Sequence, residues 1–168
     1  MFSWFSRKPR NCDRAFEDLA QMLWLEERRP TFRRELLNAD RLDFSLVSLE
    51  HVDDYLEAVH RDLPDQEQLG YLALRTGAYV GEVIRRHAGQ EYHWYDFKQA
   101  SKLSEFVKTL GVNLGTAGVL AVDAEHVCFP IAKVMKYLEN GAEDSVHFFA
   151  RIGIEGPPTE TEGMQAPS

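Results

Sequence analysis

Apolar residues recur at helical spacing through the first half of the chain. The longest pattern covers residues 65–88, where one face repeats at intervals of three and four residues over about six turns. Its members are Leu69, Leu72, Ala73, Thr76, Val80, Val83, Ile84 and His87. Shorter patterns of the same kind predict helices over about 13–28, 31–37 and 48–63. The first half is therefore predicted to be helical, with prolines between the helices.

Three glycines interrupt the side chains of the long helix 65–88. Gly77 and Gly81 lie four residues apart beside the apolar face, with Gly70 further back. A glycine inside a helix costs about 1 kcal/mol relative to alanine. A helix that tolerates several of them is expected to approach a neighbouring backbone closely at these positions.

The second half of the chain mixes short strand and helix patterns. The aromatic run 91–97 predicts a strand with Tyr92 and Trp94 on one side and His93 and Tyr95 on the other. Apolar runs on either side of a polar turn at 123–125 are typical of a β-hairpin. Further helices are predicted over about 98–111, 130–140 and 144–152. The sum is a helix-rich α+β fold with a small antiparallel sheet of about three strands in the second half.

Composition and charge divide the chain into three parts. Residues 1–12 are expected to be a flexible N-terminus, and 13–154 a single globular domain. Residues 155–168 are rich in Pro, Gly, Thr and Glu, which predicts a disordered acidic tail. The formal net charge of the 168 residues is −8. Residues 36–168 carry 11 basic and 21 acidic side chains, so the body of the chain is the more acidic part.

The same features exclude several classes of protein. The acidic balance argues against nucleic-acid binding, which relies on a basic face. No run of 18 apolar residues exists, so stable membrane insertion is not expected. The first ten residues lack the apolar stretch of a signal peptide, which predicts a cytoplasmic protein with Cys12 and Cys128 reduced. An alternative is a peripheral membrane accessory protein held by Phe2, Trp4 and Phe5.

Motifs that hold phosphate, a catalytic nucleophile or a metal ion are absent from the sequence. There is no GxxxxGK[ST], GxSxG, CxxC or HExxH. The sequence therefore predicts no cofactor and no metal site. An enzyme acting on a small molecule is the alternative to a binding protein, and it requires Glu82 and Tyr79 to meet a histidine such as His93 or His126.

One candidate site is a polar face of the long helix, formed by Arg75, Tyr79, Glu82 and Arg86 at spacings of 4, 3 and 4 residues. A carboxylate between guanidinium groups is suited to hold a polar ligand or a charged side chain of a partner. The alternative is a structural ion network that reaches a neighbouring element. Because flanking cations lower the pKa of a carboxylate, Glu82 is a poor candidate for a general base.

Two further sets of residues are candidates for binding a partner. Tyr92 and Trp94 are of the types enriched at interfaces, and equally at home in a core. The most compact acidic patch lies on the predicted helix 48–63 and is formed by Glu50, Asp53, Asp54 and Glu57. Such a patch either attracts a basic protein partner or is an ordinary solvated helix face.

The order of these elements over about residues 42–150 resembles a group of small bacterial cytoplasmic proteins of uncharacterised function. The resemblance is carried by the capped helix beginning Ser48-Leu49, the Gly-Ala-Tyr-x-Gly-Glu sequence at 77–82, and the helix led by Pro130 that ends in Asn140-Gly141. It implies a shared fold and assigns no activity. A looser similarity links such small acidic domains to immunity proteins encoded beside secreted toxins. We therefore expect a non-catalytic acidic binding protein, for example an immunity-type inhibitor of a basic partner.

Overall fold

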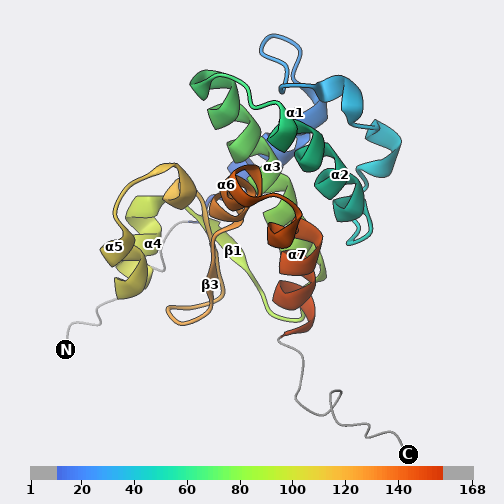
Figure 1. Ribbon diagram of the computed structural model, residues 1–168. Helices are drawn as coiled ribbons and strands as arrows, with labels where there is room; N and C mark the ends of the chain where they lie inside the picture. The colour runs from blue at the N-terminus through green and yellow to red at the C-terminus, as the bar shows by residue number, and fades with distance from the viewer. Residues whose placement is uncertain (1–10, 157–168) are drawn as a thin grey trace, which may run out of the picture.

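A computed structural model of the chain describes residues 11–156 (Figure 1). Within this range the chain forms seven α-helices and a three-stranded antiparallel sheet, which confirms the predicted helix-rich α+β fold. The α-helices are α1 (Asp13–Leu25), α2 (Ser48–Arg61), α3 (Gln66–His87), α4 (Phe97–Leu103), α5 (Glu105–Leu110), α6 (Pro130–Asn140) and α7 (Val146–Glu155). The strands are β1 (His93–Tyr95), β2 (Val119–Ala121) and β3 (Val127–Cys128). Short 3₁₀ helices are η1 (Arg34–Leu36), η2 (Ala39–Arg41), η3 (Leu114–Thr116) and η4 (Ala142–Asp144).

Helix α3 runs through the centre of the molecule and packs against α1, α6 and α7 (Figure 1). The predicted close approach is confirmed at two of its three glycines. A Cβ at Gly77 would lie 2.6 Å from the backbone Cα of Ile131 in α6, and a Cβ at Gly81 would fall on the indole ring of Trp94. Gly70 has no neighbour within 4 Å of such a Cβ. The two inner glycines therefore set how closely α6 and β1 pack on α3.

The sheet has the order β1-β2-β3, with both pairs antiparallel. The predicted hairpin is confirmed, because Leu120 of β2 pairs with Cys128 of β3 and the Asp123 carboxylate accepts the N–H groups of Glu125 and His126 in the turn. The two sides of β1 face different cores. Trp94 packs among α1 and α3, whereas Tyr95 belongs to a smaller cluster with α4 and α5.

Several predicted boundaries are wrong, including the end of the helix expected over 13–28, which stops at Leu25. The helix expected over 98–111 divides at Ser104, whose extended backbone separates α4 from α5. The helix expected over 31–37 is reduced to η1, because Arg33 adopts a left-handed conformation (φ 53°) that an α-helix cannot contain. At the C-terminal end, Glu155 is the last residue of α7 and not the first of a tail. Residues 1–10 and 157–168, with the flexibility and membrane contact predicted for them, lie outside the described residues.

Candidate functional site

The four residues predicted to share a polar face of α3 contact three different parts of the structure. Arg75 donates through Nη1 to the carbonyl of Arg29 (2.7 Å) and to the Thr31 hydroxyl (3.1 Å). The Tyr79 hydroxyl accepts the N–H of Phe44 (3.0 Å) and shares a hydrogen bond with Ser48 (2.7 Å). Neither side chain bonds to Glu82. The predicted face is therefore a row of separate anchors and not a single site.

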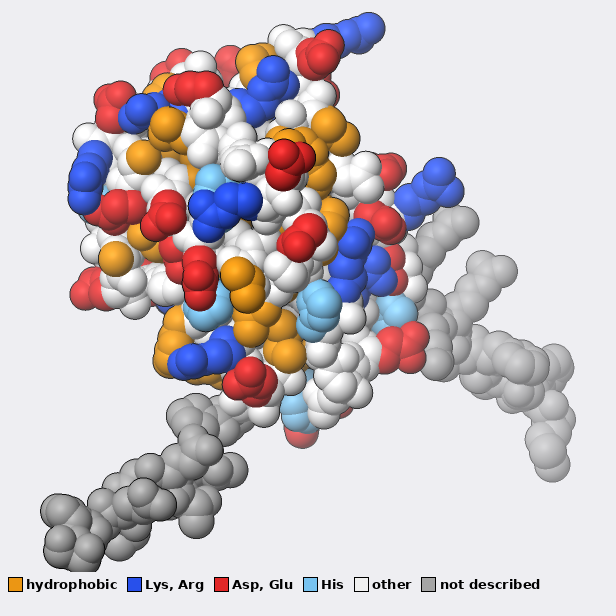
Figure 2. Space-filling model, turned by 90° about the vertical axis from the view of Figure 1, so that its right-hand side faces the viewer, with side chains coloured by type: hydrophobic (Ala, Val, Ile, Leu, Met, Phe, Trp, Pro, Cys, Tyr) orange, Lys and Arg blue, Asp and Glu red, His pale blue; other side chains and the backbone are white. Residues whose placement is uncertain are grey.

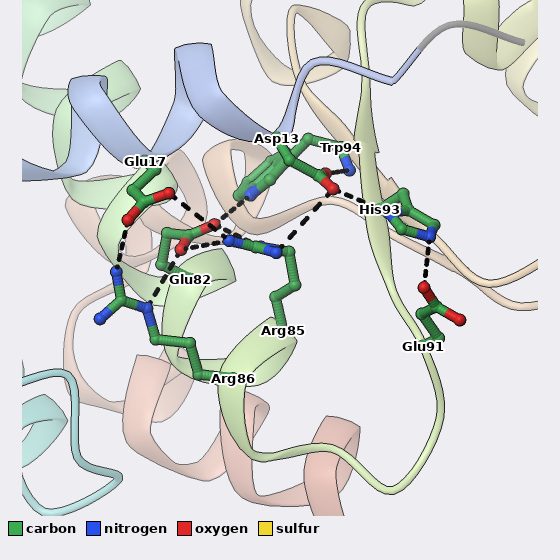
Figure 3. A network of polar contacts seen from close by, with 8 residues as sticks. All are labelled: Asp13, Glu17, Glu82, Arg85, Arg86, Glu91, His93 and Trp94. Atoms are coloured by element: carbon green, nitrogen blue, oxygen red, sulfur yellow. Dashed lines mark hydrogen bonds and ion pairs between the residues drawn. The ribbon is translucent and has the colours of Figure 1, made fainter.

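Glu82 lies at the centre of a buried polar network (Figure 3). Its side chain is 0% exposed. Oε1 accepts the Nε1–H of Trp94 (2.9 Å) and the Nε–H of Arg85 (2.7 Å), while Oε2 accepts from Nη2 of Arg85 (3.0 Å) and Nε of Arg86 (3.2 Å). Four charge-assisted hydrogen bonds thus hold the carboxylate between α3 and β1.

The network continues to α1 through Asp13 and Glu17. Asp13 accepts the backbone N–H of Trp94 and the Nδ1–H of His93, both at 2.7 Å. Glu17 lies 3.4 Å from Nη2 of Arg86. These carboxylates join α1 to β1 and to the end of α3, as Figure 3 shows. The arrangement matches the interpretation of the polar face as a structural network reaching neighbouring elements.

The sequence indicated only part of this network. The Glu82–Arg86 pair was predicted from its spacing of four residues and is present. Arg85 was not singled out, although it lies three residues from Glu82 and makes the shorter contact. Trp94 also changes role, because it is 0% exposed and stacks on Phe16 with ring centroids 4.3 Å apart. In this fold Trp94 is a core residue that no partner can reach, while Tyr92 is half-buried.

The structure gives Glu82 no access to a substrate. Its carboxylate is sealed, and His93 hydrogen-bonds to Asp13 and not to Glu82. His126 lies in the hairpin turn, where its Nδ1 donates to Asp123 (2.8 Å). Desolvation by its apolar neighbours raises the pKa of the half-buried Cys128 thiol, so at neutral pH the sulfur is protonated and weakly nucleophilic. The predicted pocket of Glu82, Tyr79 and a histidine does not form.

The acidic patch predicted on α2 is partly used inside the fold. The Asp53 carboxylate accepts the Ser145 hydroxyl (2.6 Å) and the backbone N–H groups of Val146 (2.8 Å) and His147 (3.3 Å) at the start of α7. Glu57 pairs with Arg61 at 3.0 Å. Only Glu50 and Asp54 of the four are exposed. Figure 2 shows acidic and basic side chains interspersed over the face where α2 and α7 lie, with no continuous acidic surface.

We expect Asp53→Ala to lower the free energy of unfolding by about 1–2 kcal/mol, because the first turn of α7 loses its acceptor. The matched control is Asp54→Ala, which removes the same charge from the adjacent exposed position and should change stability by less than about 0.5 kcal/mol. Urea unfolding of both variants measures the difference. Equal effects would show that Asp53 acts only through its charge.

An open groove lies between α5, β3 and α6. Its volume is about 460 Å³. The lining is mainly apolar and is formed by Phe106, Leu110, Asn113, Gly115, Thr116, Val127, Cys128, Phe129, Ala132, Lys133, Lys136 and Phe149. Phe106 is 57% exposed and Leu110 is 42% exposed, which is unusual for large apolar side chains. The short helix α5 buries Val107 and leaves these two side chains at the groove.

Two lysines of α6 lie on the rim of the groove. Lys133 is neutralised by Asp144, with Nζ 2.6 Å from the carboxylate. Lys136 is exposed, and within residues 11–156 no carboxylate lies within 4.0 Å of its Nζ. The groove therefore combines a mainly apolar lining with a lysine at its edge, Lys136, that makes no direct ion pair within the described residues.

Comparisons with protein-family profiles, with curated protein sequences and with solved structures find no significant match to this chain. None of the helices in residues 11–156 combines the length and apolar character needed to cross a membrane. The same residues contain no group of three or more His, Cys, Asp or Glu side chains placed to hold a metal ion.

Proposed function

We propose that this protein is a non-catalytic binding protein and that the groove between α5, β3 and α6 receives an apolar segment of a partner protein. The observation that carries the proposal is the exposure of Phe106 and Leu110 at the edge of a groove of about 460 Å³. Contiguous apolar surface on a soluble domain is characteristic of interaction sites. Burying a phenylalanine or leucine side chain contributes about 1.5–3 kcal/mol, so two such anchors supply a useful share of a binding energy.

The polar residues of the domain support binding rather than catalysis. The best candidate for an acid or base, Glu82, is enclosed by two arginines and an indole. Admitting a substrate to Glu82 would require breaking its buried ion pairs with Arg85 and Arg86, which costs several kcal/mol. The groove requires no such rearrangement, because its apolar side chains already face solvent.

The charge of the protein indicates what charge its partner carries. The net charge of −8 favours long-range attraction of a basic protein, which raises association rates at low ionic strength. Close to the groove, the exposed Lys136 favours a carboxylate next to the apolar anchors of the bound segment. An inhibitor that neutralises a basic toxin, the immunity-type role, is one function that such a surface would serve.

Selection from a random peptide-display library tests the groove directly. We expect the wild-type protein to enrich peptides that combine two or three large apolar residues with an acidic one. The double variant Phe106→Ser/Leu110→Ser should bind the selected peptides at least tenfold more weakly, as expected for loss of central anchors. Leu63→Ser is the matched control, because Leu63 is 53% exposed and does not line the groove.

The proposal is contradicted if no sequence is enriched, or if enriched peptides bind the double variant as tightly as the wild type. A partner captured from the source organism should show the same dependence on Phe106. Its association rate should fall as salt is added, because the long-range attraction is screened. A captured protein that ignores both changes does not use this groove.

A further inference from the structure

The connection between α1 and α2 carries four arginines in seven residues, at positions 28, 29, 33 and 34. Two buried side chains from other helices hold this connection in place. Tyr55 of α2 donates its hydroxyl to the carbonyl of Phe32 (2.5 Å), and Arg75 of α3 donates to the carbonyl of Arg29 and to Thr31. The arginine-rich connection is therefore fixed to the body of the protein from beneath.

Arg75 is a buried cation without a carboxylate partner. It is 2% exposed, its Nε has no hydrogen-bond partner, and no carboxylate in residues 11–156 lies within 4.0 Å of its guanidinium. Burial lowers the pKa of Arg75, and the more distant Glu26 only partly offsets this effect. The Glu26 carboxylate is instead occupied by the backbone N–H groups of Arg28 and Arg29. Buried charges are normally paired with a carboxylate, whereas this guanidinium has only its hydrogen bonds to the connection and the Tyr71 ring, whose centroid lies 5.1 Å from Cζ.

A cavity of about 450 Å³ lies at this connection, on a different part of the molecule from the groove of α5. It is lined by Pro30, Thr31, Phe32, Arg33, Arg34, Glu35 and Gln68. Arg33, Arg34 and Gln68 share this lining with one carboxylate, Glu35, which lies 3.7 Å from Nε of Arg33. Arg34 donates through Nη1 to the carbonyl of Glu26 (2.8 Å), which leaves its other N–H groups for a ligand. Thr31 both lines the cavity and accepts the hydrogen bond from Arg75. The cavity is thus rich in hydrogen-bond donors and has a second layer of positive charge behind it.

We propose that this cavity binds the phosphate group of a small phosphorylated molecule through Arg33 and Arg34, with Arg75 supporting the site from below. Guanidinium groups present paired donors that match a phosphate, and they remain charged at all physiological pH values. The volume suits a small-molecule ligand. The proposed phosphate site is independent of the groove of α5, because no residue lines both the cavity and the groove.

Titration of the ¹⁵N-labelled protein with inorganic phosphate and with pyrophosphate, at constant ionic strength, tests the site. We expect saturable shifts of the amide signals of Thr31, Arg33 and Gln68. The double variant Arg33→Gln/Arg34→Gln should weaken binding at least tenfold, while Glu35→Gln should strengthen it. Arg28→Gln is the matched control, because Arg28 is an exposed arginine of the same connection that does not line the cavity.

Shifts that rise linearly without saturation would overturn the proposal, as would an equal loss of binding in Arg28→Gln. Acetate that binds as tightly as phosphate would overturn the assignment to phosphate. A thermal-shift measurement keeps the test independent of the NMR signals, since pyrophosphate should raise the melting temperature of the wild type but not of Arg33→Gln/Arg34→Gln. Phosphate binding retained in Phe106→Ser/Leu110→Ser would separate this site from the groove.

Discussion

Gly81→Ala is expected to lower the free energy of unfolding by about 3 kcal/mol. The new methyl group would fall on the indole of Trp94, which is 0% exposed and cannot move outward. Displacing that ring also breaks its hydrogen bond to Glu82. The gain in helix propensity, about 1 kcal/mol, offsets only part of this cost.

Gly77→Ala should behave similarly, because its Cβ would meet the backbone of Ile131, which has no rotamer to change. The control is Gly70→Ala on the same helix, where nothing lies within 4 Å of the new Cβ. That substitution should stabilise the protein by about 0.5–1 kcal/mol. Thermal unfolding measures all three, with a shift of roughly 2–4 °C expected per kcal/mol for a chain of this length. The same sign at all three positions would contradict the close-packing explanation.

The glycines also show what the sequence could predict. Helical spacing located α3, and the presence of Gly77 and Gly81 within it correctly indicated a close neighbour. The pattern could not identify the neighbours. Ile131 lies in α6, far from Gly77 in the sequence, and Trp94 lies in a strand that follows α3. Helical spacing also could not distinguish Gly70 from the other two glycines, although no atom lies within 4 Å of a Cβ at Gly70.

The backbone conformation of single residues overrides periodicity at the helix boundaries that were predicted wrongly. Lys98 to Leu110 has helical spacing throughout, but Ser104 adopts an extended conformation and ends α4 there. The short α5 that follows exposes Phe106, which lines one wall of the groove. Periodicity predicts that a face is apolar and cannot show whether another element covers it.

The polar sites were the least predictable from sequence. A glutamate flanked by arginines on a helix is usually solvated, and nothing local indicates that Glu82 is fully buried. Its burial depends on Trp94 and on Asp13 of α1, which approach only in the folded protein. The cavity beside Arg33 was also missed, although the run of arginines was visible, because its support comes from Arg75 on a distant helix.

Glu82→Ala is expected to cost about 3–5 kcal/mol, the largest effect of any single substitution considered, because it leaves buried partners without their counter-charge. Trp94 would keep a buried N–H without an acceptor, and Arg85 and Arg86 would lose their shared carboxylate. Glu82→Gln should cost less, since the amide oxygen still accepts from Trp94. Arg86→Ala should also cost less, because Arg86 is 34% exposed and Glu82 retains Arg85.

Urea unfolding of the three variants gives the order, and binding of the peptides selected on the groove gives a second measurement. A structural role predicts that Glu82→Gln loses stability while the fraction that remains folded binds normally. A variant of full stability that no longer binds would instead place Glu82 in the functional site. The two measurements together therefore separate a residue that holds α1, α3 and β1 in position from one that contacts a ligand.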